Sequence, residues 1–268
     1  MKLGTMTKVY TRSTITETLD ALKTDGFSVL HFNHPLPSSQ IGLEALQSEL
    51  TTRGQALASL SGTYNMIHPD LAQRNAGYDK LRAAIFAADA LKVKGVALST
   101  GTRDAQNMWR FHPENASKEA WSDLTQALER ALTLAQEQNV VLLIEPEASN
   151  VVSSAQKCRQ ILDEMQSPFL KVIMDGANLF QPGQSEQMDE VLHRSFDLLQ
   201  GDIFLAHAKD IADWDALSFT GAGNGLLNFP LYLSLLKNSG YRGPLLLHGQ
   251  NERETPACRD FLLRLLEG

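Results

Sequence analysis

The sequence predicts a (β/α)₈ TIM barrel, an α/β fold that forms a single domain over residues 1–268. Three observations lead to this prediction. Short apolar runs alternate with longer amphipathic segments from one end of the chain to the other. The apolar runs recur at intervals of roughly 30–40 residues, and the length of 268 residues agrees with the roughly 250 residues typical of such barrels. An open, doubly wound sheet is the alternative, but the glycine-rich turn that usually follows its first strand is not present.

The predicted strands are nearly continuous runs of Val, Ile, Leu and Ala with little polar alternation. That composition is typical of parallel strands that are covered on both faces. The first segment is less regular than the others and is assigned because it precedes the first helix. In chain order, the predicted strands are Lys2–Tyr10, Phe27–Phe32, Ala56–Leu60, Gly95–Ser99, Val140–Ile144, Leu170–Met174, Ile203–Ala206 and Pro244–Leu247.

The segments between these strands predict amphipathic helices. The first helix begins at the capping box Thr14–Glu17 and stops at Gly26. Apolar residues at helical spacing predict two further helices, one from Tyr78 to Leu91 and one from Trp121 to Ala135. Later helices are predicted over residues 153–166, 186–200, 229–239 and 255–266. We interpret each apolar stripe as core packing against the sheet.

Composition and charge argue against several classes of partner. The 31 acidic residues outnumber the 24 basic ones and give a net charge of −7, so nucleic acid is not expected to be the main partner. No apolar run approaches the about 20 residues of a membrane span, and the N-terminus is too polar for a signal peptide. The two cysteines, Cys158 and Cys258, predict neither a disulfide framework nor a cysteine zinc site, and a reducing cytoplasm is the expected location. A homo-oligomer remains open.

Ligand-type residues directly follow four consecutive predicted strands. These residues are Glu145, Asp175, His207 and His248. The carboxyl ends of the strands of a barrel meet at one face, where its chemistry takes place, so we expect these four side chains to converge. Two carboxylates and two imidazoles suit Mn²⁺, Co²⁺, Zn²⁺ or Fe²⁺ better than Ca²⁺. The sequence therefore predicts one divalent metal ion at the barrel mouth, with ordinary loop hydrogen bonding as the alternative role.

Two loops at the same end offer further binding groups. The long loop from Gly101 to Asn115 carries Trp109, which can stack on the apolar face of a sugar. It also carries Arg103 and Arg110, either of which can hold an anionic group. An oligomer contact or a loop anchor is the alternative for this segment. The run Gly221–Gly225 follows the seventh strand, where barrels often bind phosphate, although glycines also simply permit tight turns.

These residues and their surroundings resemble the xylose-isomerase-like TIM-barrel family of sugar and sugar phosphate isomerases and epimerases. The resemblance covers nearly the whole chain. It is carried by Leu143–Glu147, Val172–Asn178, His207–Asp210, Gly240–Leu245 and Ser61–Asp70. Family enzymes typically bind one divalent metal through Glu, Asp, His and a final Glu, which implies Glu145, Asp175 and His207 as ligands here. His248 departs from the pattern at the fourth position, and Asn178 stands where members often carry His.

The resemblance implies a metal-dependent isomerase or epimerase of a sugar, sugar phosphate or small polyol that acts through an enediolate. Glu145 is then a ligand and a base, and His248 is either the fourth ligand or the second acid/base. The substrate is a small carbohydrate. The residues predicted to contact it are His68, Asn65, Arg103, Trp109, Glu147, Asn178 and Lys209.

Three other functions remain open at this point. A dehydratase or lyase acting on a related polyol would use the same metal site. A metal-dependent endonuclease for damaged DNA shares this barrel, but it predicts several zinc ions, more histidine ligands and basic loops. A binding or scaffold protein that has lost its metal is the third alternative, because His248 and Asn178 depart from the family pattern.

Overall fold

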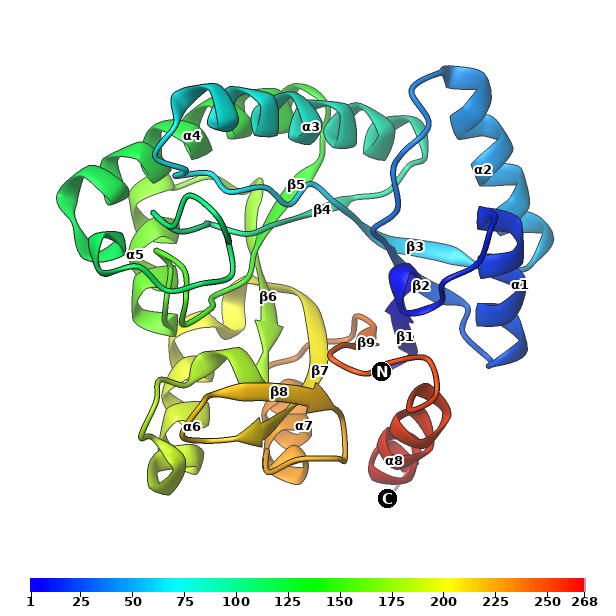
Figure 1. The fold of residues 1–268 in the computed structure, drawn as a ribbon. Helices are drawn as coiled ribbons and strands as arrows, with labels where there is room; N and C mark the ends of the chain where they lie inside the picture. The colour runs from blue at the N-terminus through cyan, green and yellow to red at the C-terminus, as the bar shows by residue number, and fades with distance from the viewer. Residues whose placement is uncertain (268) are drawn as a thin grey trace.

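Eight parallel strands form a closed barrel in the computed structural model, which describes residues 1–267 (Figure 1). In chain order they are β1 (Leu3–Met6), β2 (Val29–Phe32), β3 (Ala56–Ser61), β4 (Gly95–Leu98), β5 (Val141–Ile144), β6 (Leu170–Asp175), β7 (Ile203–Asp213) and β9 (Leu245–Leu247). Neighbours along the chain pair in parallel, and β9 closes the ring by pairing with both β7 and β1. The predicted (β/α)₈ barrel is confirmed.

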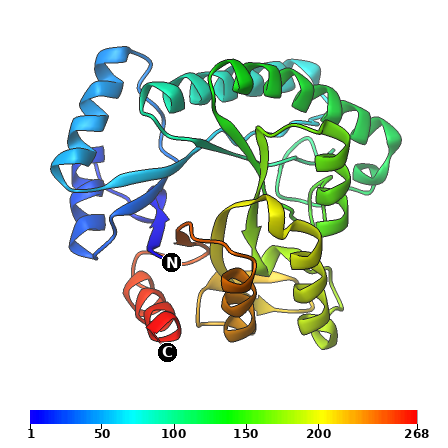
Figure 2. The ribbon, with the colours of Figure 1, turned by 180° about the vertical axis from the view of Figure 1, so that it is seen from behind.

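Helices surround the barrel on its outside, as the reverse view shows (Figure 2). They are α1 (Ile15–Thr24), α2 (Gln40–Thr52), α3 (Leu71–Ala90), α4 (Lys118–Glu137), α5 (Ala155–Met165), α6 (Met188–Leu199), α7 (Phe229–Asn238) and α8 (Thr255–Glu267). The predicted capping box is present at the start of α1, where Thr14 and Glu17 bond reciprocally to each other's backbone. None of the helices within residues 1–267 is long and apolar enough to cross a lipid bilayer.

Two elements were not predicted from the sequence. Helix α2 is one; its buried face consists of only three leucines, Leu43, Leu46 and Leu50. The other is β8 (Ser218–Gly221), which pairs antiparallel with the far end of β7. The prediction for β7 ended at Ala206, because polar residues follow it, whereas the strand continues to Asp213. Strand β7 therefore leaves the barrel and forms a hairpin with β8 above the carboxyl ends of the other strands.

The interior of the barrel is packed and not hollow. A small apolar cluster from five strands fills it, consisting of Ala97, Leu143, Ile173, Leu205 and Leu246. A larger core lies between the strands and the surrounding helices. Side chains that point inward at the carboxyl ends of the strands lie beyond the small cluster. This arrangement gives the mouth of the barrel a closely packed apolar base.

Candidate metal centre

Four ligand-type side chains meet at the carboxyl ends of four strands. Glu145 directly follows β5, Asp175 is the last residue of β6, His207 lies within β7, and His248 directly follows β9. Asp175 pairs with His207 across the β6–β7 ladder, and His207 pairs with Leu246 across the β7–β9 ladder. The register of the sheet therefore places Asp175 and His207 side by side, and Glu145 and His248 follow the ends of the two flanking strands.

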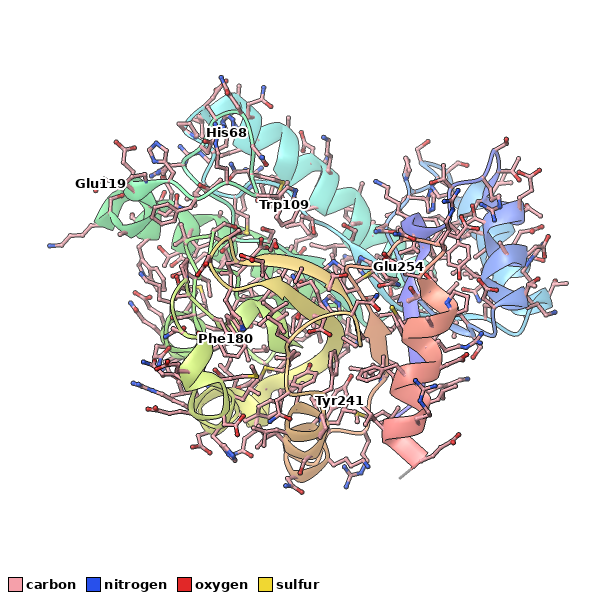
Figure 3. All side chains as sticks on the ribbon, turned by 60° about the horizontal axis from the view of Figure 1, so that its bottom comes forward. His68, Trp109, Glu119, Phe180, Tyr241 and Glu254 are labelled. Atoms are coloured by element: carbon pink, nitrogen blue, oxygen red, sulfur yellow. The ribbon has the colours of Figure 1, made fainter. Side chains whose placement is uncertain are left out.

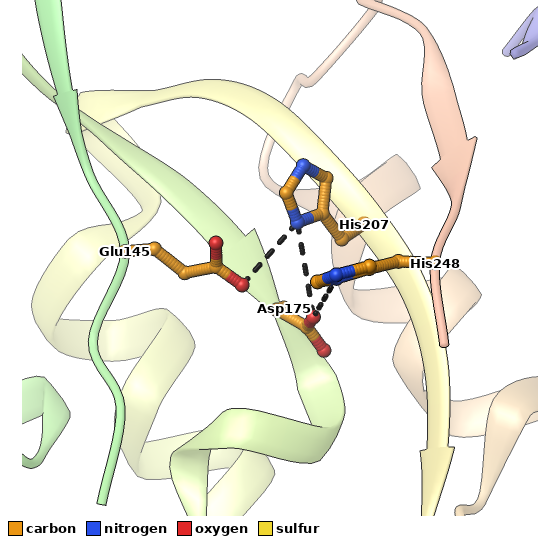
Figure 4. A group of neighbouring side chains, drawn as sticks. All are labelled: Glu145, Asp175, His207 and His248. Atoms are coloured by element: carbon orange, nitrogen blue, oxygen red, sulfur yellow. Dashed lines mark hydrogen bonds and ion pairs between the residues drawn. The ribbon is translucent and has the colours of Figure 1, made fainter. Parts of the chain in front are cut away.

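The ligand atoms lie at separations that suit a single cation (Figure 4). One atom from each of the four residues lies within 4.8 Å of all the others. His207 Nδ1 is 3.3 Å from Glu145 Oε1 and 3.8 Å from Asp175 Oδ2, and His248 Nδ1 is 3.4 Å from the same Asp175 oxygen. Four ligands at about 2.1 Å from a tetrahedral ion would be about 3.4 Å apart. The residues present therefore fit a divalent metal.

The charges of the cluster also favour a bound cation. Burial alone would lower the pKa of His207, but the Glu145 and Asp175 carboxylates outweigh burial and raise it to about 9. The pKa of Asp175 is held well below its usual range, because Lys209 and the imidazoles of His207 and His248 outweigh the effect of burial. Burial lowers the pKa of His248. Two carboxylates at this depth attract positive charge, which a metal ion can supply.

Two buried residues support the carboxylates from the side. Asn178 donates a hydrogen bond from Nδ2 to Glu145 Oε1 at 2.8 Å, and its own Oδ1 accepts one from Lys209. Lys209 Nζ also lies 3.6 Å from Asp175 Oδ2. Both side chains are buried, so Asn178 and Lys209 fix the orientation of ligand-type groups.

Tyr232 of α7 connects the strands beneath the cluster. Its buried hydroxyl lies 2.8 Å from the carbonyl oxygen of Met174 and 2.9 Å from that of His207. The tyrosine thus holds β6 and β7 together at the level of Asp175 and His207. A helix outside the barrel is in this way coupled to the position of two ligand-type residues.

The cluster lies at the base of a cavity of about 550 Å³, which is within the range of small-molecule sites. Of the residues predicted to contact substrate, Glu147 and Trp109 line this cavity together with Glu145, His207 and His248. Burial raises the pKa of Glu147 to about 7. Trp109 is 52% exposed and lies on the loop over the strand ends (Figure 3).

Sequence reasoning missed several residues that line this cavity. They are Lys8, His31, Asn33, Ser61, Ser99 and Gln250. His31 is buried, with its Nδ1 2.7 Å from Ser59 Oγ, and it also lines the cavity. The available signal was a polar residue inside an apolar strand, close to the carboxyl end of that strand.

Three residues predicted to contact substrate make loop contacts outside this cavity. Asn65 donates to the carbonyl of Thr102 and accepts from its backbone N–H. His68 Nε2 lies 3.1 Å from the carbonyl oxygen of Ala105, and Figure 3 shows His68 toward the periphery. Arg103 forms an ion pair of 2.7 Å with Asp123 of α4. The contacts of Asn65 and His68 connect the loop after β3 with the loop after β4, and that of Arg103 ties the second loop to α4. The roles predicted for the three residues in binding stay predictions.

The glycine run Gly221–Gly225, which follows the β7–β8 hairpin, directs its backbone donors to a side chain of the same chain. The Asp210 carboxylate accepts hydrogen bonds from the backbone N–H groups of Gly223, Gly225 and Leu227 at 2.9–3.0 Å. It also accepts one from its neighbour Ile211. Asp210 therefore occupies the position that a phosphate would need, and the alternative of tight turns fits this loop.

Comparison with known proteins agrees with the fold. The family model for the xylose isomerase-like TIM barrel matches residues 19–264. No curated protein matches the chain by sequence. Among solved structures, a D-tagatose 3-epimerase-like protein is similar with a TM-score of 0.79 at 17% identity, covering 100% of this chain and 97% of that one.

Two further solved structures share the fold at low identity. The probable 3-DHS dehydratase AsbF from Bacillus anthracis has a TM-score of 0.73 at 13% identity, covering 100% of this chain and 99% of its own. The IolI protein, solved with a bound zinc atom, has a TM-score of 0.72 at 17% identity, covering 92% of this chain and 88% of its own. At these identities the likeness establishes the shared fold.

Proposed function

The chain belongs to the xylose isomerase-like TIM-barrel family, and on that premise we propose that it is a divalent-metal-dependent isomerase or epimerase of a sugar, sugar phosphate or small polyol. One observation carries the proposal: Glu145, Asp175, His207 and His248 converge with ligand atoms within 4.8 Å of one another. The cavity above them has the size of a small-molecule site. A solved structure of the same fold holds a zinc atom, which supports a metal in this one.

Glu145, Asp175, His207 and His248 would hold the ion. When bound, a divalent cation supplies positive charge that stabilises negative charge developing on substrate oxygens. His248 is assigned as the fourth ligand, because its Nδ1 lies beside the Asp175 oxygen and not apart from the cluster. Mn²⁺, Co²⁺, Zn²⁺ and Fe²⁺ all accept this mixed oxygen and nitrogen set.

The chain's own residues carry out the proton transfer and the positioning. Isomerisation or epimerisation requires removal of a proton from a carbon beside a carbonyl group, and Glu145 is the carboxylate placed to accept it. Asn178 orients Glu145 by donating to its Oε1. Glu147 lines the same cavity and accepts a hydrogen bond from Ser149, so it is placed to bind substrate hydroxyls.

A dehydratase acting on a related polyol is the second candidate. It would need the same metal and the same proton removal, followed by loss of a hydroxyl group. His248 in place of a second carboxylate favours it, because two-base epimerisation would lack its second carboxylate at that position. The similar fold of a probable dehydratase also supports it.

The first test replaces Glu145. We expect Glu145→Gln to reduce the metal content of the purified protein by roughly tenfold or more, because a charged ligand is replaced by a neutral amide. Elemental analysis measures the metal directly. Glu186→Gln is the matched control, since Glu186 is an exposed carboxylate outside the cavity. Full metal content in Glu145→Gln would contradict the assignment.

The reaction itself is tested with a panel of ketoses and inososes in D₂O. An isomerase or epimerase that exchanges the abstracted proton with solvent places deuterium on the product carbon, which NMR detects. A dehydratase instead gives a product lighter by one water, which mass spectrometry detects. Substrate turnover that persists at full rate after chelation would contradict metal dependence.

A further inference from the structure

A second cavity of about 450 Å³ adjoins the metal-centre cavity. Trp109 and Glu147 line both cavities and therefore stand at the passage between them. We call this second cavity the annexe and define it by Phe111, Gln181, Ala216, Leu217 and Phe219, together with the two shared residues. The metal-centre cavity and the annexe are each large enough to hold part of one extended ligand.

The walls of the annexe come from segments that extend beyond the barrel. One wall is the loop after β4, which carries Trp109 and Phe111. The opposite wall is the β7–β8 hairpin, which carries Ala216, Leu217 and Phe219. Neither segment is needed to close the ring of eight strands. Their shared use as walls indicates a role in selecting the ligand, as loops at the mouths of such barrels commonly have.

Both walls are fixed in place. The loop is held by an ion pair between Arg110 and Asp104, whose carboxylate also accepts two backbone N–H groups of the loop. The hairpin is held by Trp214, which packs edge-on against buried Phe180 with ring centroids 5.1 Å apart. The annexe is therefore a preformed cavity, and binding does not need to order its walls.

The turn of the β7–β8 hairpin contains a leucine, Leu217, in an unfavourable backbone conformation. It has a φ of +44°, a left-handed backbone conformation that β-turns usually assign to glycine or asparagine. Leucine in this conformation is strained, because its Cβ crowds the backbone. The side chain that results lines the annexe. A bulky apolar residue at such a turn makes sense where its side chain forms part of a binding wall.

The lining of the annexe is amphipathic. Trp109 and Phe111 are 52% and 61% exposed, which is unusual for two large aromatic side chains so close in sequence. Ser149, Gln181 and Glu147 add hydroxyl, amide and carboxyl groups to the same cavity. A pyranose ring has the matching chemistry, because it presents C–H groups on its faces and hydroxyl groups around its rim.

We propose that the annexe binds the second sugar ring of a glycosylated ketose whose reacting end occupies the metal-centre cavity. The proposal rests on the proposed function for the position of the reacting end. Trp109 lies between the two rings and contacts both, while Phe111 and Leu217 contact only the outer one. The substrate class is thereby narrowed from monosaccharides to disaccharides with a free ketose end.

The test compares binding of D-fructose with binding of four glucosyl-fructoses that differ in linkage: turanose, maltulose, leucrose and isomaltulose. Isothermal titration calorimetry measures each affinity for the Mn²⁺-loaded protein. We expect at least one disaccharide to bind roughly tenfold tighter than D-fructose, the equivalent of one favourable ring-stacking contact. Equal affinities for D-fructose and all four disaccharides would overturn the proposal.

Two variants test whether the preference for disaccharides over D-fructose arises in the annexe. Phe111→Ala removes a wall of the annexe, and Ala216→Trp fills the cavity from the exposed hairpin turn. Both should bring the disaccharide affinity close to that of D-fructose and leave the D-fructose affinity unchanged. Phe86→Ala is the matched control, because Phe86 is an exposed aromatic residue on α3 that lines neither cavity. A preference that survives Ala216→Trp would overturn the proposal.

Other outcomes separate this proposal from the proposed function. Tight disaccharide binding that depends on Phe111, without turnover of any sugar, would contradict the isomerase and support the annexe. Turnover of monosaccharides without a disaccharide preference would overturn the annexe alone. Tighter binding of 4-O-benzyl-D-fructose, which keeps the free ketose end, than of every disaccharide would also overturn it, because the annexe would then select a purely apolar group.

Discussion

His31 is a buried imidazole whose ionisation opposes folding. Burial, together with the nearby imidazoles of His207 and His248, lowers its pKa to about 3. In the unfolded chain its pKa returns to about 6.5. His31 therefore does not reduce the free energy of unfolding above pH 6.5. As the pH falls from 6.5 toward 3, the free energy of unfolding decreases, because in this range only the unfolded chain binds the proton.

We expect His31→Asn to flatten this dependence. Between pH 6 and pH 4, the free energy of unfolding of the wild type should fall by about 1.4 kcal/mol per pH unit more steeply than that of the variant. Asparagine keeps a polar partner for Ser59. Urea denaturation of both proteins in the presence of the same chelator measures the difference. His193→Asn, at an exposed position on α6, is the control and should keep the wild-type slope.

Single residues were predictable where their position after a strand was enough. Glu145, Asp175, His207 and His248 were identified because each follows an apolar run or ends it, and the carboxyl ends of barrel strands converge. Contacts within loops gave no such signal. Arg103 pairs with Asp123 of α4, which lies 20 residues further along the chain, and only the folded loop brings them together.

At the scale of elements, Asp210 organises the segment that follows the β7–β8 hairpin. The carboxylate is buried and accepts backbone N–H groups from four residues. Asp210→Ala would leave these donors without their partner, and hydrogen bonds to a charged group contribute about 1.5–3 kcal/mol each. We expect Asp210→Ala to lower the free energy of unfolding by about 3–5 kcal/mol, and Asp210→Asn, which keeps one oxygen, to lower it by about half as much.

Urea denaturation at neutral pH provides the measurement for both Asp210 variants. Asp213→Asn is a suitable control, because Asp213 is exposed and accepts a single N–H from Ala216. A loss below about 0.5 kcal/mol for Asp210→Ala would show that water replaces the carboxylate without cost. In that case the loop would also be free to bind an anion, contrary to the structure.

Elements were predictable where their pattern was local. The apolar stripes of helices α3 and α4 are long, and the strands that neighbour them in the chain are uninterrupted apolar runs. Helix α2 was not predicted, because three buried leucines over thirteen residues make a weak apolar stripe. The extension of β7 was not predicted, because Lys209 and Asp210 are charged. The fold buries both residues, and their hydrogen-bond partners are distant in sequence. Their burial is a tertiary effect that local hydrophobicity does not reveal.

At the scale of the whole molecule, the closed barrel makes the site a collective property. The ligand-type residues extend from Glu145 to His248, and they meet because β5, β6, β7 and β9 are successive neighbours in the barrel. The barrel could be predicted from the alternation of elements. The annexe could not, because its walls depend on how a loop and a hairpin rest against the barrel, as the packing of Trp214 on Phe180 illustrates.

The packed interior of the barrel predicts a compensating pair of substitutions. A methyl group added at Gly95 of β4 would lie 2.8 Å from the Leu143 side chain of β5 and 3.0 Å from the Phe204 ring of β7. Gly95→Ala should therefore cost about 1–3 kcal/mol through overpacking. Leu143→Ala should cost about 2–5 kcal/mol, because it leaves a cavity in the fully buried cluster.

The double variant should lose less stability than the sum of the two single losses. In Gly95→Ala/Leu143→Ala the added methyl group enters the space that Leu143 vacates, so we expect a favourable coupling of about 1 kcal/mol or more. Urea denaturation of the wild type, both single variants and the double variant completes the cycle. If the two single losses of stability add up to the loss of the double variant within about 0.5 kcal/mol, residues 95 and 143 do not share packing space. That result would contradict a tightly packed barrel interior beneath the metal centre.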